Sequence, residues 1–226
     1  ALLASGDAYR AAKSLRDFGV SAENVSFDFA KVMARKDRVV KQIRSGVEFL
    51  MKKNAITVYS GAGTLTGPHS IGVANEQQEE ITADYTILAT GSVPSRPPIP
   101  GMDGANVVTS DELLFWESVP SSMIVIGAGA IGLEFACFFN AMGSKVTVLE
   151  GLAHVLPLED EQIAAELAAS LKKQGIKVQA DALVSGIGDA DGQKTVTYTV
   201  RGQEDQGAQT ASAELVLVAT GRWPYT

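Results

Sequence analysis

Cysteine and histidine are scarce in this sequence of 226 residues, which holds one cysteine, Cys137, and two histidines, His69 and His154. A single cysteine excludes an internal disulfide framework, and two distant histidines argue against a His-rich metal centre, so we predict no metal site. Cys137 lies in an apolar stretch among phenylalanines, which indicates a buried structural thiol. Both histidines are predicted to lie in loops.

The sequence also lacks an excess of positive charge and long apolar runs. Its 19 Lys and Arg against 26 Asp and Glu give a net charge of −7, which argues against binding to nucleic-acid phosphates. No apolar run reaches the about 18 residues of a membrane span, and no signal peptide opens the chain. We expect a globular protein that binds neither nucleic acid nor membrane, in the cytoplasm, or in the mitochondrial matrix if it is eukaryotic.

The N-terminal half changes its hydrophobic period along the chain. Residues 1–18 and 29–53 have helical periodicity. Short strands are predicted next, at 56–60, 71–74, 81–83 and 85–89. Residues 92–101 contain Pro94, Pro97, Pro98 and Pro100, and predict an extended connector.

The C-terminal half alternates strands with helices. We predict strands at 123–126, 145–150 and 176–178, and helices at 130–142 and 161–174. A meander of strands at 184–186, 195–200 and 215–219 follows, with a turn at 189–192. This alternation indicates an α/β fold with a parallel sheet covered on both faces.

A strand that ends in Ala-Thr-Gly occurs twice, at 86–91 and at 217–221. Each copy follows a set of short alternating strands. The repetition suggests two related dinucleotide-binding domains, one of them only partly present. Because residue 1 is Ala and residues 223–226 directly follow a strand-like run, we expect a piece of a longer protein.

The sequence from Gly127 to Gly132 matches the G-x-G-x-x-G fingerprint of dinucleotide-binding folds, between a predicted strand and a predicted helix. The first glycine permits a tight turn, the second lets a pyrophosphate approach, and the third lets the helix pack on the strand. The helix N-terminus offers free N–H groups to the phosphates. A glycine-rich turn without a ligand is the alternative, but strand, glycines and helix together favour dinucleotide binding.

Glu150 ends the next predicted strand, at about the 20-residue spacing that the fingerprint requires. A carboxylate there accepts hydrogen bonds from the hydroxyls of the adenosine ribose, and it repels the 2′-phosphate of NADP. Residues 151–155 include no Arg or Lys that could bind that phosphate. The sequence therefore predicts a preference for NAD over NADP.

These motifs resemble the pyridine nucleotide–disulfide oxidoreductases, most closely their dihydrolipoamide dehydrogenase branch. The resemblance covers the whole chain and rests on ATGS at 89–92, GAGAIGLE at 127–134, VTVLE at 146–150, Leu156-Pro157 and ATGR at 219–222. It implies a Rossmann-like NAD-binding domain with a three-stranded meander at 111–221, part of a related FAD-binding domain at 1–110, and the start of a return to that domain at 222–226.

The resemblance also implies cofactor contacts. Gly63, Thr90, Gly91 and Ser92 would touch FAD. The residues that would surround NAD are Gly127, Ala128, Gly129, Ala130, Ile131, Gly132, Leu133, Glu134, Glu150, Val184 and Gly221. Glu134 would support catalysis by pairing with a family lysine beside the flavin, although a first-turn acid favoured by the helix dipole is an equal alternative.

In the family, a redox-active cysteine pair lies upstream of this segment, and a dimerisation domain with a His–Glu base lies downstream. We therefore expect no catalytic residue here beyond the supporting Glu134. The full enzyme would convert dihydrolipoamide and NAD to lipoamide and NADH through FAD, as a homodimer acting on a lipoyl-bearing protein or a small disulfide. The alternatives are a soluble transhydrogenase or mercuric reductase of the same family, or a non-catalytic dinucleotide-binding module.

Overall fold

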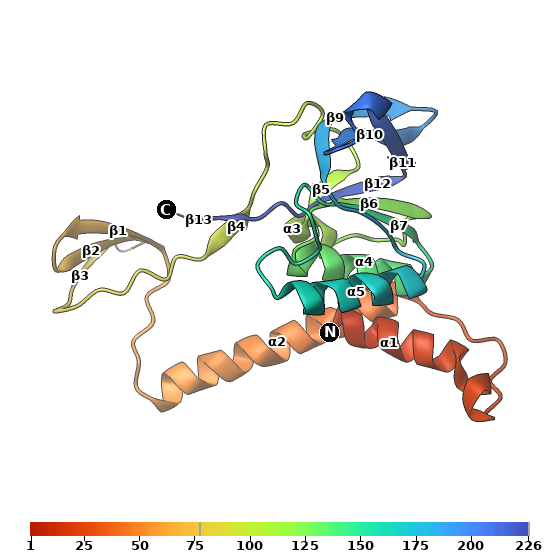
Figure 1. The fold of residues 1–226 in the computed structure, drawn as a ribbon. Helices are drawn as coiled ribbons and strands as arrows, with labels where there is room; N and C mark the ends of the chain where they lie inside the picture. Colours follow the sequence, from red (N-terminus) through yellow and green to blue (C-terminus); the bar gives the residue numbers. More distant parts are fainter. Residues whose placement is uncertain (77, 226) are drawn as a thin grey trace. The chain divides into compact units, whose positions relative to one another are not determined.

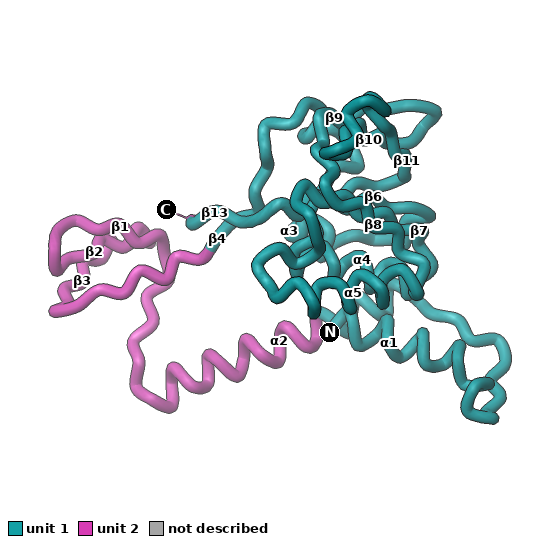
Figure 2. The backbone as a smooth tube through the Cα atoms, viewed as in Figure 1, with its two compact units in different colours: residues 1–36, 92–224 teal, residues 37–91, 225–226 magenta. Residues whose placement is uncertain are grey.

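The computed structural model describes residues 1–76 and 78–225. They form two compact units, one of residues 1–36 and 92–224 and one of residues 37–91 and 225–226 (Figure 2). This division differs from the predicted boundary at residue 110, because residues 1–36 and 92–110 pack with the predicted NAD-binding residues. The assignment of FAD and NAD to separate domains stays a prediction.

The first unit is built on a five-stranded parallel sheet (Figure 1). Its strands, in spatial order, are β5 (Val107–Thr109), β12 (Leu215–Val218), β6 (Ser122–Ile126), β7 (Lys145–Leu149) and β8 (Lys177–Gln179). The prediction that 215–219 belongs to the meander is wrong, since β12 pairs in parallel with both β5 and β6. All four residues of β12 are buried, as expected of a strand covered on both faces.

The meander consists of three antiparallel strands, β9 (Ala182–Ala190), β10 (Gln193–Val200) and β11 (Gln209–Ala213), in the order β11-β10-β9. Asp191 and Gly192 form the predicted turn with φ values of 50° and 75°, the left-handed pair that a type I′ hairpin requires. Strand β11 was not predicted from the sequence, and it takes the meander position that had been predicted for residues 215–219.

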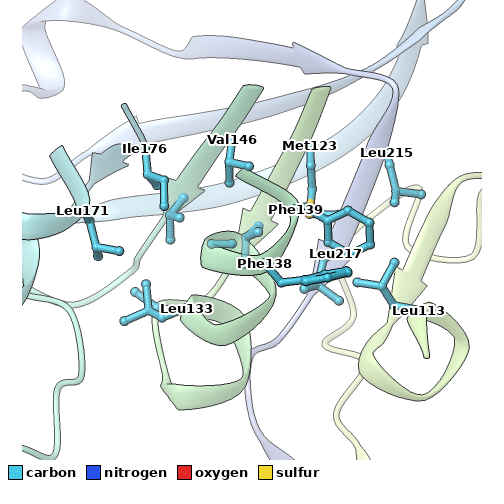
Figure 3. Packing of buried hydrophobic residues seen from close by; sticks show 14 of the residues in the cluster. Leu113, Met123, Leu133, Phe138, Phe139, Val146, Leu171, Ile176, Leu215 and Leu217 are labelled. Carbon is cyan, nitrogen blue, oxygen red and sulfur yellow. The ribbon is translucent and has the colours of Figure 1, made fainter. Parts of the chain in front are cut away.

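Helices cover the parallel sheet. Helix α4 (Ala130–Met142) ends at Gly143 with φ 109°, and its Phe138 and Phe139 are buried in the core against the sheet (Figure 3). Helix α1 (Leu2–Lys13) lies so close to α4 that a Cβ on Gly6 would stand 3.3 Å from the Ala141 Cβ. Helix α5 (Glu161–Lys173) is capped by Asp160, whose carboxylate accepts hydrogen bonds from the backbone N–H groups of Gln162 and Ile163.

Short elements complete the first unit. The 3-10 helix η1 (Leu15–Phe18) follows α1, η2 (Glu204–Gln206) precedes β11, and α3 (Ser110–Leu113) follows β5. The predicted connector at 92–101 begins as a strand, because β4 (Ser92–Pro94) pairs antiparallel with β13 (Arg222–Pro224). Residues 222–224 thus pair with residues 92–94, which lie within the range predicted for the FAD domain, and both strands belong to the first compact unit. The return of 222–226 to an FAD domain stays a prediction.

Helix α2 (Phe29–Lys53) begins in the first unit and ends in the second, within the predicted range. The second unit contains a three-stranded antiparallel sheet of β1 (Ala62–Gly67), β2 (Ser70–Ala74) and β3 (Glu79–Thr82). The strand predicted at 56–60 is absent from this described region, and the chain there is coil. Among the described helices, none combines the length and the apolar character that crossing a bilayer requires.

The strand predicted at 85–89 is also wrong. Tyr85 and Ile87 are 91% and 89% exposed, and no strand of the described chain pairs with them. An apolar run becomes a buried parallel strand only when neighbouring strands satisfy its backbone groups and cover its side chains. The described residues provide no such neighbours at this position.

Candidate functional site

A cleft of about 660 Å³ opens in the first unit at the carboxyl ends of β6, β7 and β12. Ile126, Leu149 and Val218, the last residues of these strands, form part of its lining. Open parallel sheets bind their ligands at this edge, and the volume lies within the range of small-molecule and cofactor sites. The cleft is therefore the candidate site of this unit.

The glycine turn, residues 127–132, forms one side of the cleft. Gly127 has φ 103°, and a Cβ there would collide with the carbonyl group of Ala219. A Cβ on Gly132 would overlap the carbonyl oxygen of Gly127 and lie 3.1 Å from the Val125 Cγ1. The first glycine thus permits the turn and the third permits close helix–strand packing, as the fingerprint predicts.

Gly129 differs from these two glycines. No described atom lies within 4 Å of the position that its Cβ would take, apart from its chain neighbours. Gly129 is the N-cap of α4, whose first intrahelical hydrogen bond runs from the Leu133 N–H to the Gly129 carbonyl. The N–H groups of residues 130–132 precede that bond, so the helix leaves them to an outside acceptor. This open, N–H-lined space fits a pyrophosphate.

Glu150 lies at the end of β7 and is 7% exposed. Its Oε2 accepts a hydrogen bond of 2.6 Å from the Ala128 N–H, and its Oε1 accepts one of 2.9 Å from the Leu152 N–H. Two strands hold its backbone, because its N–H donates to the Gln179 carbonyl and its carbonyl accepts from the Ala182 N–H. The carboxylate is therefore fixed at the edge of the cleft, where the adenosine ribose was predicted.

The structure separates the residues predicted to surround NAD into three groups. Those that line the cleft are Gly127, Gly129, Ala130, Ile131, Glu150, Val184 and Gly221. Ala128, Gly132 and Leu133 are buried behind it, and Leu133 belongs to the hydrophobic core. Glu134 is exposed in the second turn of α4, so its interpretation as a first-turn acid is wrong. Its supporting role stays a prediction.

Apolar side chains that were not predicted from the sequence form much of the remaining lining. Leu152, Leu158 and Leu183 line the cleft and are 50%, 96% and 47% exposed. Exposed leucines on the loop after β7 and on β9 offer an apolar surface to a flat ring. Leu152 and Leu158 could have been identified from the sequence, because both are apolar residues in a predicted loop. Such residues have no core to pack into, and they often line a binding site.

Arg222 also lines the cleft, beside Gly221. Its Nε donates to the Ser92 Oγ at 2.8 Å, and its Nη1 lies 3.3 Å from the Asp111 Oδ1. Arg222 thus connects β13 with β4 and with the start of α3. Ser92, predicted to touch FAD, has its hydroxyl bonded to this guanidinium.

The other residues predicted to touch FAD lie in the second unit. Gly63 pairs with Val73 in the β1–β2 ladder, and Thr90 and Gly91 are exposed coil. Among the described residues, the strand–glycine–helix arrangement that can hold a pyrophosphate occurs at 127–132. The FAD contacts of Gly63, Thr90, Gly91 and Ser92 therefore stay predictions.

The cysteine and the histidines have structural surroundings. Burial raises the pKa of the Cys137 thiol above its usual value, which disfavours the reactive thiolate. The His69 Nδ1 lies 3.2 Å from the Ala83 carbonyl, and the His154 Nδ1 lies 2.9 Å from the Val155 carbonyl. The described residues contain no group of three or more His, Cys, Asp or Glu side chains placed to hold a metal ion.

Comparison with protein-family models matches residues 1–226 to the pyridine nucleotide-disulphide oxidoreductases. The chain belongs to this family. Family membership confirms the resemblance seen in the sequence, and members of the family are oxidoreductases that use FAD and a pyridine nucleotide.

Curated members of the family support this assignment. The chain is 39% identical over 224 residues to a dihydrolipoyl dehydrogenase of Acholeplasma laidlawii, covering 97% of this chain and 63% of that protein. It is 38% identical over 232 residues to the dihydrolipoyl dehydrogenase of Bacillus subtilis strain 168, covering 98% of this chain and 48% of that protein. The chain thus spans about half to two thirds of the length of these relatives.

A solved structure agrees in fold. The Cu(II) complex of the HOCl-induced flavoprotein disulfide reductase RclA from Escherichia coli matches with a TM-score of 0.77 and 27% identity, covering 100% of this chain and 46% of that one. The α/β fold of a disulfide reductase of this family is thereby confirmed. As with the curated relatives, the matched protein extends well beyond the length of this chain.

Proposed function

We propose that this chain is the NAD-binding segment of an FAD-dependent dithiol–disulfide oxidoreductase of the dihydrolipoyl dehydrogenase type. The observation that carries the proposal is the cleft at the carboxyl edge of the parallel sheet, with the glycine turn on one side and Glu150 at its edge. The whole protein would convert dihydrolipoamide and NAD to lipoamide and NADH. Its partner would be a lipoyl-bearing protein or a small disulfide, and it would act as a homodimer.

The residues present fit NAD. The open space at Gly129 and the N–H groups at the start of α4 would hold the pyrophosphate. Glu150 would accept hydrogen bonds from the adenosine ribose, and Leu152 and Leu183 would contact the adenine ring. Gly221 and Val184 complete the lining. When bound, NAD supplies the carbon atom that receives a hydride, while the protein provides orientation and a dry surface.

NAD is favoured over NADP for an electrostatic reason. The buried carboxylate of Glu150 would lie beside the 2′ position, where the phosphate of NADP carries its charge. Arg222, which also lines the cleft, already donates to Ser92 and pairs with Asp111. Because its guanidinium already has these partners on β4 and α3, Arg222 is not proposed to bind the 2′-phosphate of NADP.

Calorimetric titration of the folded chain with NADH tests the binding proposal. We expect saturable binding with one site per chain and a weaker response to NADPH. A chain shown to be folded by circular dichroism that binds no NADH at millimolar concentration would contradict the proposal.

A second experiment tests the part assigned to FAD. Only Gly63 and residues 90–92 of this chain are proposed to touch FAD, and all four are small residues. These few contacts would hold the flavin weakly. We therefore expect the purified chain to be colourless, and added FAD to produce no lipoamide-dependent oxidation of NADH. Yellow protein with stoichiometric FAD that turns over dihydrolipoamide would show that this segment holds a complete flavin site.

A further inference from the structure

The peptide units on both sides of Ala128 are held by hydrogen bonds from outside the glycine turn. The Ala128 N–H donates to the Glu150 Oε2 at 2.6 Å, and its carbonyl accepts from the Leu156 N–H at 2.9 Å. Ala128 is fully buried. Its N–H group is therefore already paired within the protein before any pyrophosphate binds.

The Glu150 carboxylate has a second partner, Leu152, in the segment after β7. We call residues 151–158 the wall segment, because Leu152, Pro157 and Leu158 line the cleft. The Glu150 Oε1 accepts from the Leu152 N–H, so one carboxylate joins the wall segment to the glycine turn. The hydrogen bond from the Leu156 N–H to the Ala128 carbonyl is a second connection between the wall segment and the glycine turn. The backbone of Leu156 has a left-handed φ of 47°. A non-glycine residue rarely adopts this conformation unless its surroundings impose it.

We propose that Glu150 is a positioning residue for the glycine turn, in addition to the ribose contact predicted for it. Its carboxylate orients the turn and the wall segment before a dinucleotide arrives, so that the amides of residues 130–132 already face the pyrophosphate. The inference rests on the proposed function, because it concerns the same site. Unlike the ribose contact, the positioning role predicts that Glu150 also affects the binding of ligands that lack ribose hydroxyls.

The chemistry of the two contacts requires a carboxylate. Both partners of Glu150 are N–H donors, and an ionised carboxylate has an acceptor oxygen for each. In Glu150→Gln, one side-chain oxygen becomes an NH2 group that would face an N–H donor. The same amide could still hydrogen-bond to ribose hydroxyls, since a hydroxyl both donates and accepts. Glu150→Gln therefore separates positioning from ribose binding.

Binding of ADP and of 2′,3′-dideoxy-ADP to wild type and Glu150→Gln tests the inference. A Glu150 that acted only through the ribose would leave the affinity for the dideoxy compound unchanged, or higher because a negative charge is removed. Positioning predicts that the variant binds both compounds more weakly, on the order of tenfold for the loss of a charge-assisted hydrogen bond. Glu159→Gln, which removes an exposed carboxylate nearby, is the charge-matched control and should change neither affinity.

Amide hydrogen exchange in wild type without added nucleotide provides a second test that needs no variant and no binding. We expect the Ala128 and Leu152 amides to exchange slowly and the amides of residues 130 and 131 to exchange fast. Fast exchange at Ala128, or an unchanged affinity of Glu150→Gln for dideoxy-ADP, would overturn the positioning role. A failure of wild type to bind either ADP or NADH would contradict the proposed function, while the exchange result would still decide the positioning role.

Discussion

The carbonyl oxygen of Gly127 occupies the space into which a side chain on Gly132 would project. This contact brings the start of α4 against the end of β6, and it places the helix N-terminus at the edge of the cleft. Glycine at position 132 is thus a packing requirement of the fold, whether or not a ligand binds. Substitution of Gly132 should therefore affect folding, whereas a Cβ added at Gly129 would enter open space and should affect ligand binding instead.

Gly132→Ala should destabilise the chain. The new methyl group would overlap main-chain atoms of Gly127, which cannot rotate away as a flexible side chain could. Overpacking of this kind costs about 1–3 kcal/mol, sometimes more. Urea unfolding followed by circular dichroism measures the change. Gly188→Ala, in the meander with no described atom within 4 Å of its added Cβ apart from its chain neighbours, is the control and should retain wild-type stability.

Gly129→Ala should show the opposite behaviour. Its backbone φ of −73° is accessible to alanine, so we expect a free energy of unfolding close to that of wild type. The methyl group would occupy the space proposed for the pyrophosphate, and NADH affinity should fall on the order of tenfold or more. Parallel calorimetry and urea unfolding of this variant check both expectations. Wild-type affinity for NADH would show that the pyrophosphate lies elsewhere.

Nucleotide preference should depend on Glu150 and on the exposed Leu152 beside it. Wild type should prefer NADH to NADPH, because the Glu150 carboxylate repels a 2′-phosphate. The double variant Glu150→Ala with Leu152→Arg should reverse the ratio of the two affinities, since the arginine can pair with that phosphate. Leu152→Arg alone, which retains the carboxylate, is the matched control. Equal binding of NADH and NADPH by wild type would contradict this role of Glu150.

Cys137 should behave as a structural thiol. Burial raises its pKa above the reference value of 9.0 in the folded chain, so the unfolded chain releases this proton at lower pH than the folded chain does. This group therefore contributes a loss of stability as pH rises through 9 and above. Comparing the unfolding of wild type and Cys137→Ala between pH 8 and pH 10 should show that the difference in stability narrows as pH rises. Alkylation by iodoacetamide at pH 8 should be slower than that of a free thiol, and rapid alkylation would contradict the assignment.

The sequence predicts the glycine turn well, because the turn depends on neighbouring residues. Steric limits at Gly127 and Gly132 are local, and the flanking strand and helix are continuous in the chain. The segments 85–89 and 215–218 have similar apolar sequences, yet the first is exposed coil and the second is a buried strand between β5 and β6. Hydrophobic pattern cannot distinguish them, because the outcome depends on which strands lie beside each run.

The hydrogen bonds of Glu150 were equally inaccessible from the sequence. The fingerprint locates an acidic residue after the second strand, but its partners depend on the path of the wall segment. That path includes the left-handed Leu156, which no local preference of leucine predicts. The lining by Leu152 and Leu183 likewise results from a contact between a loop and the meander.

Amide chemical shifts recorded during titration of the chain with NADH would show directly whether the dinucleotide binds in this cleft. We expect the largest changes at Gly129–Gly132, Leu152, Val184 and Gly221, and no change at the amides of β1–β3. Changes confined to the second unit, or none at millimolar NADH in a folded sample, would contradict the assignment of this cleft to NAD.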